Sequence, residues 1–179
     1  MPLSKKIKIA LTGGIGTGKT YISKHFLDIG IPIFYADEEV KKMYDSAKII
    51  AIFKDKFGDS FITNSKIDLS KLASFIFENS ENRKEIEAII HPLVMHQFED
   101  WTTHQESNVV MLESALVFEA GLEKFFDKII VVDAPLDVRI QRIKDRNLHL
   151  SEQEILQRIF LQIPQEEKCK NADFVILNI

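Results

Sequence analysis

Residues Gly13–Thr20, with the sequence GGIGTGKT, have the types and the spacing needed to bind a phosphate group. They fit the pattern G-x-x-x-x-G-K-S/T, whose glycines let the backbone turn its N–H groups toward phosphate oxygens at the start of a helix. In such a loop Lys19 reaches the β- and γ-phosphates of a nucleotide, and the hydroxyl of Thr20 binds magnesium. The alternative is a glycine-rich turn without a ligand, but a chance match is on the order of one per cent. The sequence therefore predicts a nucleotide-binding loop, here called the glycine loop.

Other parts of the sequence narrow the class of nucleotide-binding protein. A regulatory GTPase needs a guanine-reading N-K-x-D tetrapeptide, which does not occur. The tetrapeptide DKFG at Asp55–Gly58 resembles a second GTPase motif by its letters, but it lies in a helical pattern. A motor or transporter ATPase needs a chain longer than 179 residues. These exclusions favour a small phosphotransferase.

Carboxylates follow two of the expected strands. Asp37 stands where the second strand ends and a helix begins. Because the carboxyl ends of parallel strands face the ligand crevice, Asp37 is a candidate to take the proton from an attacking hydroxyl or to orient that hydroxyl. A plain helix N-cap is an equal alternative for this aspartate. Glu113 ends the third strand and could hold magnesium through a water, whereas Glu119 could orient the acceptor or cap the segment that follows.

Three arginines share one face of an expected helix. Arg139, Arg142 and Arg146 are spaced by three and four residues. Arginines on a mobile helix suit phosphoryl transfer, because they neutralise the charge spread over the transferring group. A solvated helix face paired with Asp137 and Asp145 is the other interpretation.

The elements that would position these residues are short apolar strands alternating with helices. Nearly all-apolar runs are typical of parallel strands buried on both faces, so the sequence predicts an α/β fold with a five-stranded parallel sheet. The expected strands are Ile7–Thr12, Ile31–Phe34, Val109–Ser114, Lys128–Asp133 and Phe174–Leu177.

The segment between the second and third strands is too long for one crossover and reads as a helical insertion with its own small core. A loop or short hairpin is expected within it at residues 58–66. Asp68 and Ser80 are candidate helix N-caps. Pro92 is expected to kink or break the last helix near His91.

The composition is that of an ordinary globular protein, with 45% hydrophobic and 28% charged residues. A net charge of −4 argues against bulk nucleic-acid binding. The single cysteine, Cys169, excludes a disulfide framework and a thiolate zinc site. The sequence has no secretory signal and no apolar run long enough for a membrane span, so we expect a cytoplasmic enzyme without membrane partners.

The whole chain resembles the dephospho-CoA kinase family. The resemblance rests on LTGGIGTGKT, GIPIFYAD, HPLV, ESALVFEAG, APLDVRIQRIKDRN and NADFVILN, which occur in the family's order. It implies a P-loop kinase core, a helical insertion that holds the CoA moiety, and a lid. The corresponding residues are 1–36, 109–136 and 172–179 for the core, 37–108 for the insertion and 137–171 for the lid. Another small-molecule kinase (nucleoside, nucleotide or shikimate type) and a nucleotide-binding module without turnover are the alternatives.

The resemblance also implies a reaction and a set of site residues. The γ-phosphoryl of ATP would pass to the ribose 3′-hydroxyl of dephospho-CoA, with Mg²⁺, in a monomer or a small homo-oligomer. The catalytic residues would be Asp37, Lys19 and Arg142. The ATP site would comprise Gly14, Ile15, Gly16, Thr17, Gly18, Lys19, Thr20 and Arg146. The acceptor would contact Asp37, His91 and Glu119, and the metal would contact Thr20 and, through a water, Glu113.

The sequence departs from the family's pattern at several positions. Tyr35 stands where the family commonly has a second aspartate, and Arg139 stands where the family varies. Ala115-Leu116-Val117 replaces the usual Pro-Leu-Leu, and Glu113 stands where the family often has aspartate. Members usually continue through an Asn-x-Gly turn that helps to cover the adenine, whereas this sequence stops at Asn178-Ile179.

Overall fold

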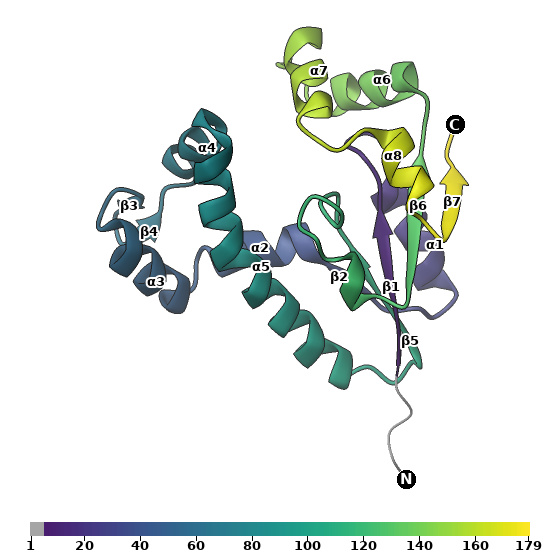
Figure 1. Ribbon diagram of the computed structural model, residues 1–179, viewed down its shortest axis with the longest axis horizontal. Helices are drawn as coiled ribbons and strands as arrows, with labels where there is room; N and C mark the ends of the chain where they lie inside the picture. The colour runs from purple at the N-terminus through teal and green to yellow at the C-terminus, as the bar shows by residue number, and fades with distance from the viewer. Residues whose placement is uncertain (1–5) are drawn as a thin grey trace. The chain divides into compact units, whose positions relative to one another are not determined.

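The computed structural model describes residues 6–179, except for the side chain of Phe77 (Figure 1). The chain divides into two compact units. The first, here called the sheet unit, contains the residues up to Tyr35 and Trp101–Ile179. The second, the helical unit, is Ala36–Asp100. Among the described residues, no helix is both long and apolar enough to cross a membrane.

The sheet unit is built on a five-stranded sheet in the order β2-β5-β1-β6-β7, in which every neighbouring pair is parallel. The strands are β1 (Ile7–Thr12), β2 (Ile33–Tyr35), β5 (Val109–Glu113), β6 (Lys128–Asp133) and β7 (Phe174–Leu177). The predicted five-stranded parallel sheet is confirmed. The second strand begins two residues later than predicted, because Ile31 still donates its N–H to Phe26 O at the end of the preceding helix.

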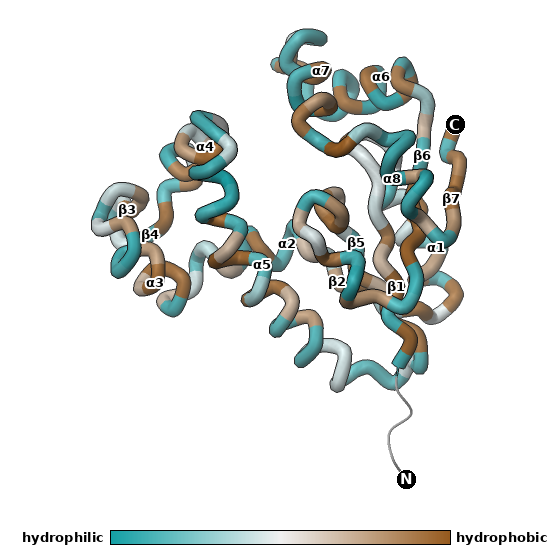
Figure 2. Tube along the Cα trace, in the orientation of Figure 1, coloured by the Kyte–Doolittle hydropathy of each residue, from teal (hydrophilic) through white to brown (hydrophobic). Residues whose placement is uncertain are grey.

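The core of the sheet unit lies on the central strands. Leu11, Ile33, Met111, Ile130 and Val132 form one buried cluster, against which part of the first helix packs. The hydrophobic colour follows β1 and β6 in Figure 2, as expected for strands covered on both faces.

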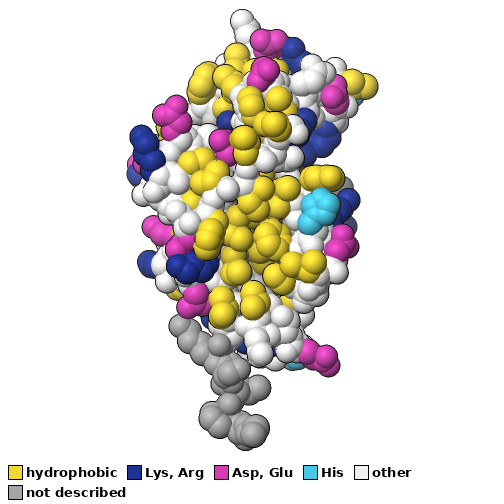
Figure 3. All heavy atoms as spheres, turned by 90° about the vertical axis from the view of Figure 1, so that its right-hand side faces the viewer, with side chains coloured by type: hydrophobic (Ala, Val, Ile, Leu, Met, Phe, Trp, Pro, Cys, Tyr) yellow, Lys and Arg dark blue, Asp and Glu magenta, His cyan; other side chains and the backbone are white. Residues whose placement is uncertain are grey.

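The edge strand β7 is much less covered. Its residues Phe174, Val175 and Leu177 are exposed. Figure 3, which views the side of the sheet unit where β7 lies, shows a broad apolar patch there. An apolar patch of this kind is typical of an interaction surface.

The described part of the sheet unit also contains the last turn of a longer helix that begins in the helical unit, together with several short helices. The short helices are α1 (Lys19–Asp28), the 3₁₀ turn η1 (Glu123–Phe125), α6 (Leu136–Arg146), α7 (Glu152–Phe160) and α8 (Gln165–Lys170). The helices α6 and α7 pack through Ile143, Ile155 and Ile159. A capping box formed by Ser151 and Glu154 starts α7.

The helical unit contains α2 (Ala36–Met43), α3 (Ala47–Phe57), the hairpin of β3 (Ile62–Thr63) and β4 (Lys66–Ile67), α4 (Leu69–Glu78) and most of α5 (Ser80–Thr103). Its core includes edge-to-face aromatic contacts of Phe61 with Phe53, Phe57 and Phe75. The unit therefore has a hydrophobic core of its own, as the sequence predicts.

Two predicted helix signals in this unit have different outcomes. Asp68 does cap α4, since its Oδ1 accepts the N–H groups of Ser70 and Lys71 at 3.1 and 3.2 Å. Ser80 is wrong as a cap: it is the first residue of α5, and Asn79 Oδ1 accepts the N–H of Asn82 at 2.8 Å.

Pro92 does not break α5, which runs without interruption from Ser80 to Thr103. Proline removes one helical hydrogen bond. The turns on either side of it bury Ile90, Val94 and Phe98, and this packing maintains the helix.

Candidate functional site

The glycine loop connects β1 to α1, and three of its glycines have backbone angles that favour glycine. The φ values are 145° at Gly13, 84° at Gly16 and 89° at Gly18. The loop also passes close to its neighbours: a Cβ at Gly13 would lie 2.3 Å from Val132 O, at the end of β6. The folded backbone of the loop therefore requires glycine at these positions, whether or not a ligand binds.

Within the loop, Thr17 and Lys19 bind backbone carbonyl groups. The buried Thr17 hydroxyl donates to Gly14 O at 2.9 Å. Lys19 Nζ donates to Gly13 O at 2.9 Å and to Gly14 O at 3.3 Å. The ammonium group therefore lies in the concave side of the loop, and Thr20, the second residue of α1, is exposed. The positive end of the α1 dipole is at this point, which favours an anion.

Two of the three predicted arginines lie on the glycine loop. Arg139 is only 5% exposed, and its Nε donates to Ile15 O at 3.0 Å. Burial lowers the pKa of this guanidinium, and Asp133 opposes the shift. Arg142 Nη1 donates to Thr17 O at 3.3 Å and to Asn178 O at 3.1 Å.

Arg146, at the end of α6, is exposed. The solvated-face interpretation is therefore wrong for Arg139, and Asp145 accepts a hydrogen bond from Gln141 instead of pairing with an arginine. Arg139 thus contacts the glycine loop directly, at a position where the family varies.

Glu113 lies at the carboxyl edge of the sheet, near the start of the glycine loop. It is the last residue of β5, in register with Leu11 of β1 and Tyr35 of β2. Its side chain is buried. Tyr35, which replaces a family aspartate, exchanges a hydrogen bond with Ser23 Oγ of α1 at 3.2 Å. The tyrosine therefore ties β2 to the helix that follows the glycine loop.

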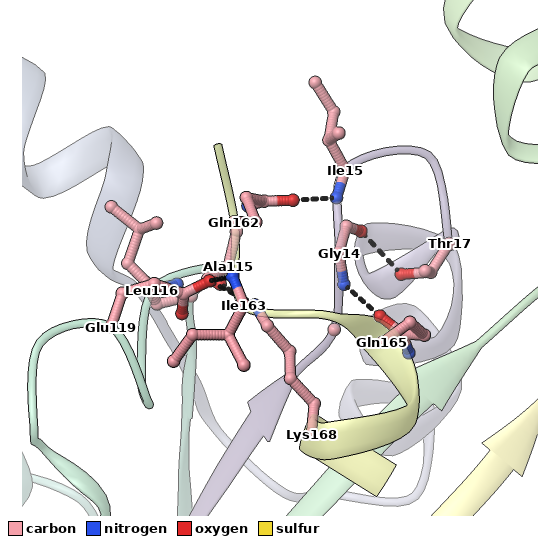
Figure 4. Close-up of polar contacts among 12 residues, drawn as sticks. Gly14, Ile15, Thr17, Ala115, Leu116, Glu119, Gln162, Ile163, Gln165 and Lys168 are labelled. Atoms are coloured by element: carbon pink, nitrogen blue, oxygen red, sulfur yellow. Dashed lines mark hydrogen bonds and ion pairs between the residues drawn. The ribbon is translucent and has the colours of Figure 1, made fainter. Parts of the chain in front are cut away.

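Glu119 forms a buried ion pair with Lys168 of α8 (Figure 4). The distance from Lys168 Nζ to Glu119 Oε1 is 2.6 Å, and the two side chains are 0% and 7% exposed. The same carboxylate oxygen accepts the N–H of Ile163 at 3.0 Å. The predicted capping role is wrong, because η1 begins after Leu122 with no side-chain cap.

Asp37 and His91 belong to the helical unit. Asp37 is exposed in the first turn of α2, two residues after β2 ends. Since Ala36 begins that helix, the N-cap interpretation of Asp37 is wrong, although an acidic residue in the first turn still favours the helix dipole. His91 is half-buried in α5, and burial lowers the pKa of its imidazole.

The sequence analysis missed two glutamines that bind the glycine loop (Figure 4). Gln165 Oε1 accepts the N–H of Gly14 at 2.9 Å, and Gln162 Oε1 accepts the N–H of Ile15 at 2.8 Å. These residues lie in and beside a short polar helix, where glutamine is common. No pattern in the sequence distinguishes these two glutamines from ordinary surface glutamines.

The oxygen donors near the glycine loop suit a magnesium ion. The Thr20 hydroxyl and the Glu113 carboxylate are hard ligands of the type that Mg²⁺ prefers. In the described part of the chain, no group of three or more His, Cys, Asp or Glu side chains gathers into a metal site. A Mg²⁺ ion bound here would take its other ligands from phosphate and water, which is usual for this metal.

Comparisons with known proteins bear on the chain as a whole. The family model described as dephospho-CoA kinase matches residues 7–179. A dephospho-CoA kinase of Bacteroides fragilis is 38% identical over 175 residues, which cover 96% of this chain and 84% of the relative.

Solved structures agree with this similarity. A crystal structure from Thermus thermophilus has a TM-score of 0.88 at 31% identity and covers 98% of this chain and 90% of that one. A dephospho-CoA kinase from Campylobacter jejuni has a TM-score of 0.65 at 28% identity, with 96% and 87% covered. A shikimate kinase from Acinetobacter baumannii, at 16% identity and a TM-score of 0.54, covers 98% and 86% and shares the fold alone. The P-loop kinase fold predicted from the sequence is thereby confirmed, and the chain belongs to the dephospho-CoA kinase family.

Proposed function

We propose that this kinase transfers the γ-phosphoryl group of ATP to the ribose 3′-hydroxyl of dephospho-CoA, giving CoA and ADP. The observation that carries the proposal is the arrangement of charge on the glycine loop. Lys19 and Arg142 both donate to carbonyl groups of this loop, at the N-terminus of α1. Two cations beside a glycine loop at a helix N-terminus support a triphosphate site there. The choice of dephospho-CoA as the acceptor rests on the similarity to relatives named dephospho-CoA kinase.

On this proposal the residues of the glycine loop and the lid divide the work on ATP. The backbone of Gly14–Gly18 surrounds the phosphates, and Lys19 neutralises the β- and γ-phosphates. Arg142 stabilises charge that develops during transfer, and Arg146 joins it when the lid closes. Arg139 supports the loop through Ile15 O.

The helical unit supplies the acceptor side. Asp37 accepts the proton of the attacking 3′-hydroxyl or orients that hydroxyl. Its exposure and its place directly after β2 suit this role. His91 binds dephospho-CoA from α5. Glu119 supports the acceptor site indirectly, because its ion pair with Lys168 holds the loop after β5 in place.

Magnesium and the cellular setting complete the proposal. Thr20 would hold Mg²⁺ directly and Glu113 would hold it through a water. The ion would supply positive charge that neutralises the phosphates. We propose a cytoplasmic enzyme, monomeric or a small homo-oligomer, which has small-molecule partners only.

An acceptor panel tests the function. The 179-residue chain is mixed with ATP and Mg²⁺ and with dephospho-CoA, shikimate, a nucleoside or a nucleotide in turn, and ADP release is followed. Release that depends on dephospho-CoA, with CoA as the product, is the expected result. Release with another acceptor and none with dephospho-CoA refutes the proposal. Binding of ATP without turnover on any acceptor favours the nucleotide-binding module.

A further inference from the structure

The segment Gln162–Lys168, here called the glutamine arm, lies between α7 and the end of α8 and contacts the glycine loop, the loop after β5 and the end of strand β6 (Figure 4). Its contacts to the glycine loop are the two hydrogen bonds of Gln162 and Gln165 described above. Gln165 also donates from Nε2 to Val132 O at 2.9 Å, at the end of β6. One side-chain amide thus joins the glycine loop to the neighbouring strand.

Lys168 fixes the other end of the glutamine arm. Its ammonium group binds Glu119 Oε1 at 2.6 Å and Ala115 O at 2.9 Å, both in the loop after β5. The N–H of Ile163 in the same arm binds Glu119 as well. Because the Lys168 side chain is fully buried, these contacts are shielded from water. The arm is therefore anchored independently of the glycine loop that it contacts.

The two glutamines bind the first half of the glycine loop, where the glycines give the backbone its greatest conformational freedom. Gly14 lies between Gly13 and Gly16, whose φ values are both positive, and glycine has the greatest backbone freedom of all residues. Fixing the N–H groups of Gly14 and Ile15 limits the orientations of the peptide units that follow. Those units lead into Lys19 and Thr20 at the N-terminus of α1.

A neutral amide suits this task better than a carboxylate. The glutamine oxygen accepts the N–H as a carboxylate would, but it adds no negative charge beside the site where phosphates bind. Arg139 completes the clamp from the other side, because its Nε binds Ile15 O while Gln162 binds Ile15 N.

We propose that Gln162 and Gln165 are positioning residues for the phosphates of ATP. They fix the N–H groups of Gly14 and Ile15, so that the glycine loop keeps its phosphate-binding shape before the nucleotide arrives. This inference rests on the proposed function for the identity of the ligand. It gives the glutamine arm a role in ATP binding that the glycine-loop motif does not contain.

Amide hydrogen exchange, read by NMR on the free protein, tests the contacts. Gln162→Met and Gln165→Met keep the length of the side chain and remove the acceptor. We expect exchange roughly tenfold faster at Ile15 in the first variant and at Gly14 in the second. Gln162→Glu restores an acceptor and should restore the protection of Ile15. Gln157→Met is the matched control, because Gln157 is exposed on α7 of the same lid.

Equilibrium titration with ATP and Mg²⁺, without acceptor, tests the consequence. Loss of one hydrogen bond that orders the loop should weaken ATP binding by about 3- to 10-fold. The KM for ATP should rise with it, whereas the KM for dephospho-CoA stays near that of the wild type. Gln157→Met should change neither quantity.

Several results would overturn the proposal. Exchange at Gly14 and Ile15 that is already fast in the wild-type protein would mean that the hydrogen bonds do not form, whatever the variants do. Faster exchange without weaker ATP binding would make the glutamines structural only. The exchange and binding measurements need no turnover, so they can succeed even if dephospho-CoA proves to be the wrong acceptor.

Discussion

The ion pair between Lys168 and Glu119 is the contact in the sheet unit whose loss should be most costly. The 2.6 Å separation is not unusual, since Lys144 of α6 and Glu152 of α7 have the same separation. The two pairs differ in burial: Lys144 and Glu152 are 39% and 58% exposed, whereas Lys168 and Glu119 are 0% and 7% exposed. Burial lowers the pKa of Lys168, and the carboxylate of Glu119 opposes that shift.

The test removes the cation and leaves the anion in place. In Lys168→Met, the Glu119 carboxylate remains buried without its counter-ion, and such a change costs about 3–5 kcal/mol of unfolding free energy. The matched variant Lys144→Met should cost less than about 1 kcal/mol, because water replaces the lost partner. In Lys168→Met/Glu119→Gln the buried charge is gone and an acceptor for Ile163 N–H is kept, so the loss should shrink to about 1–2 kcal/mol.

Urea unfolding followed by tryptophan fluorescence is the suitable assay. Trp101 is the single tryptophan of the chain and lies in the sheet unit, with its ring 5.6 Å from that of Phe34. The signal therefore reports on the unit that contains the ion pair. With a slope of about 2 kcal/mol per molar urea, Lys168→Met should lower the midpoint by roughly 1.5–2.5 M.

The reasoning fails if Lys168→Met unfolds within about 0.5 M urea of Lys144→Met. It also fails if the double variant is no more stable than Lys168→Met, because the cost would then come from the lost lysine packing and not from an unpaired charge.

Four further results are expected. Asp37→Asn should lower kcat at least about a hundredfold while ATP still binds in a titration, and turnover like that of the wild type would exclude a proton acceptor at this position. Arg142→Ala should lower kcat more than ATP affinity, since its charge matters most in the transition state; a change in melting temperature alone would refute this. Gly13→Ala should cost at least about 2 kcal/mol in urea unfolding, because φ is 145° and the new Cβ would meet Val132 O at 2.3 Å. NMR titration of His91 should give a pKa below the ordinary value for histidine, because burial disfavours the charged imidazole. The unfolded chain then binds this proton at a higher pH than the folded chain does, so the free energy of unfolding should fall as the pH drops through the ordinary pKa of histidine. An ordinary pKa for His91 would contradict the burial argument.

The sequence was informative where one local pattern determines one element. Three of the five sheet strands have the predicted bounds, because short apolar runs between polar residues mark where each strand begins and ends. The glycine loop was predicted for a similar reason: its glycines are needed for backbone angles that few other residues adopt.

The sequence was less informative where a contact joins distant segments. Ser80 and Asn79 are both good cap residues, and only the packing of α5 decides which of them the helix uses. Pro92 has a fixed local effect, but burial of the neighbouring turns outweighs it.

The glutamine arm is the extreme case of this difficulty. Gln165 and Gly14 are 151 residues apart in the chain, and no periodicity relates them. Lys168 would be placed on the surface by any reading of composition, because lysine is almost never fully buried unless it is paired. Its partner Glu119 lies in a loop whose course depends on the whole sheet. Such residues can be recognised only in the folded structure, where segments distant in the sequence meet at the carboxyl edge of the sheet.

The cations on the glycine loop show why the arm matters to the proposed reaction. Lys19 and Arg142 now bind neutral carbonyl oxygens of the loop, and charged phosphate oxygens are stronger acceptors for both side chains. On the proposed function, a triphosphate would compete with these carbonyls for both side chains. If the backbone also had to be ordered at that moment, part of the binding free energy would be lost to conformational entropy. Gln162 and Gln165 bind the N–H groups of Gly14 and Ile15 in the folded chain, so on our proposal the loop is ordered when the chain folds. More of the binding free energy would then remain for interactions that strengthen in the transition state.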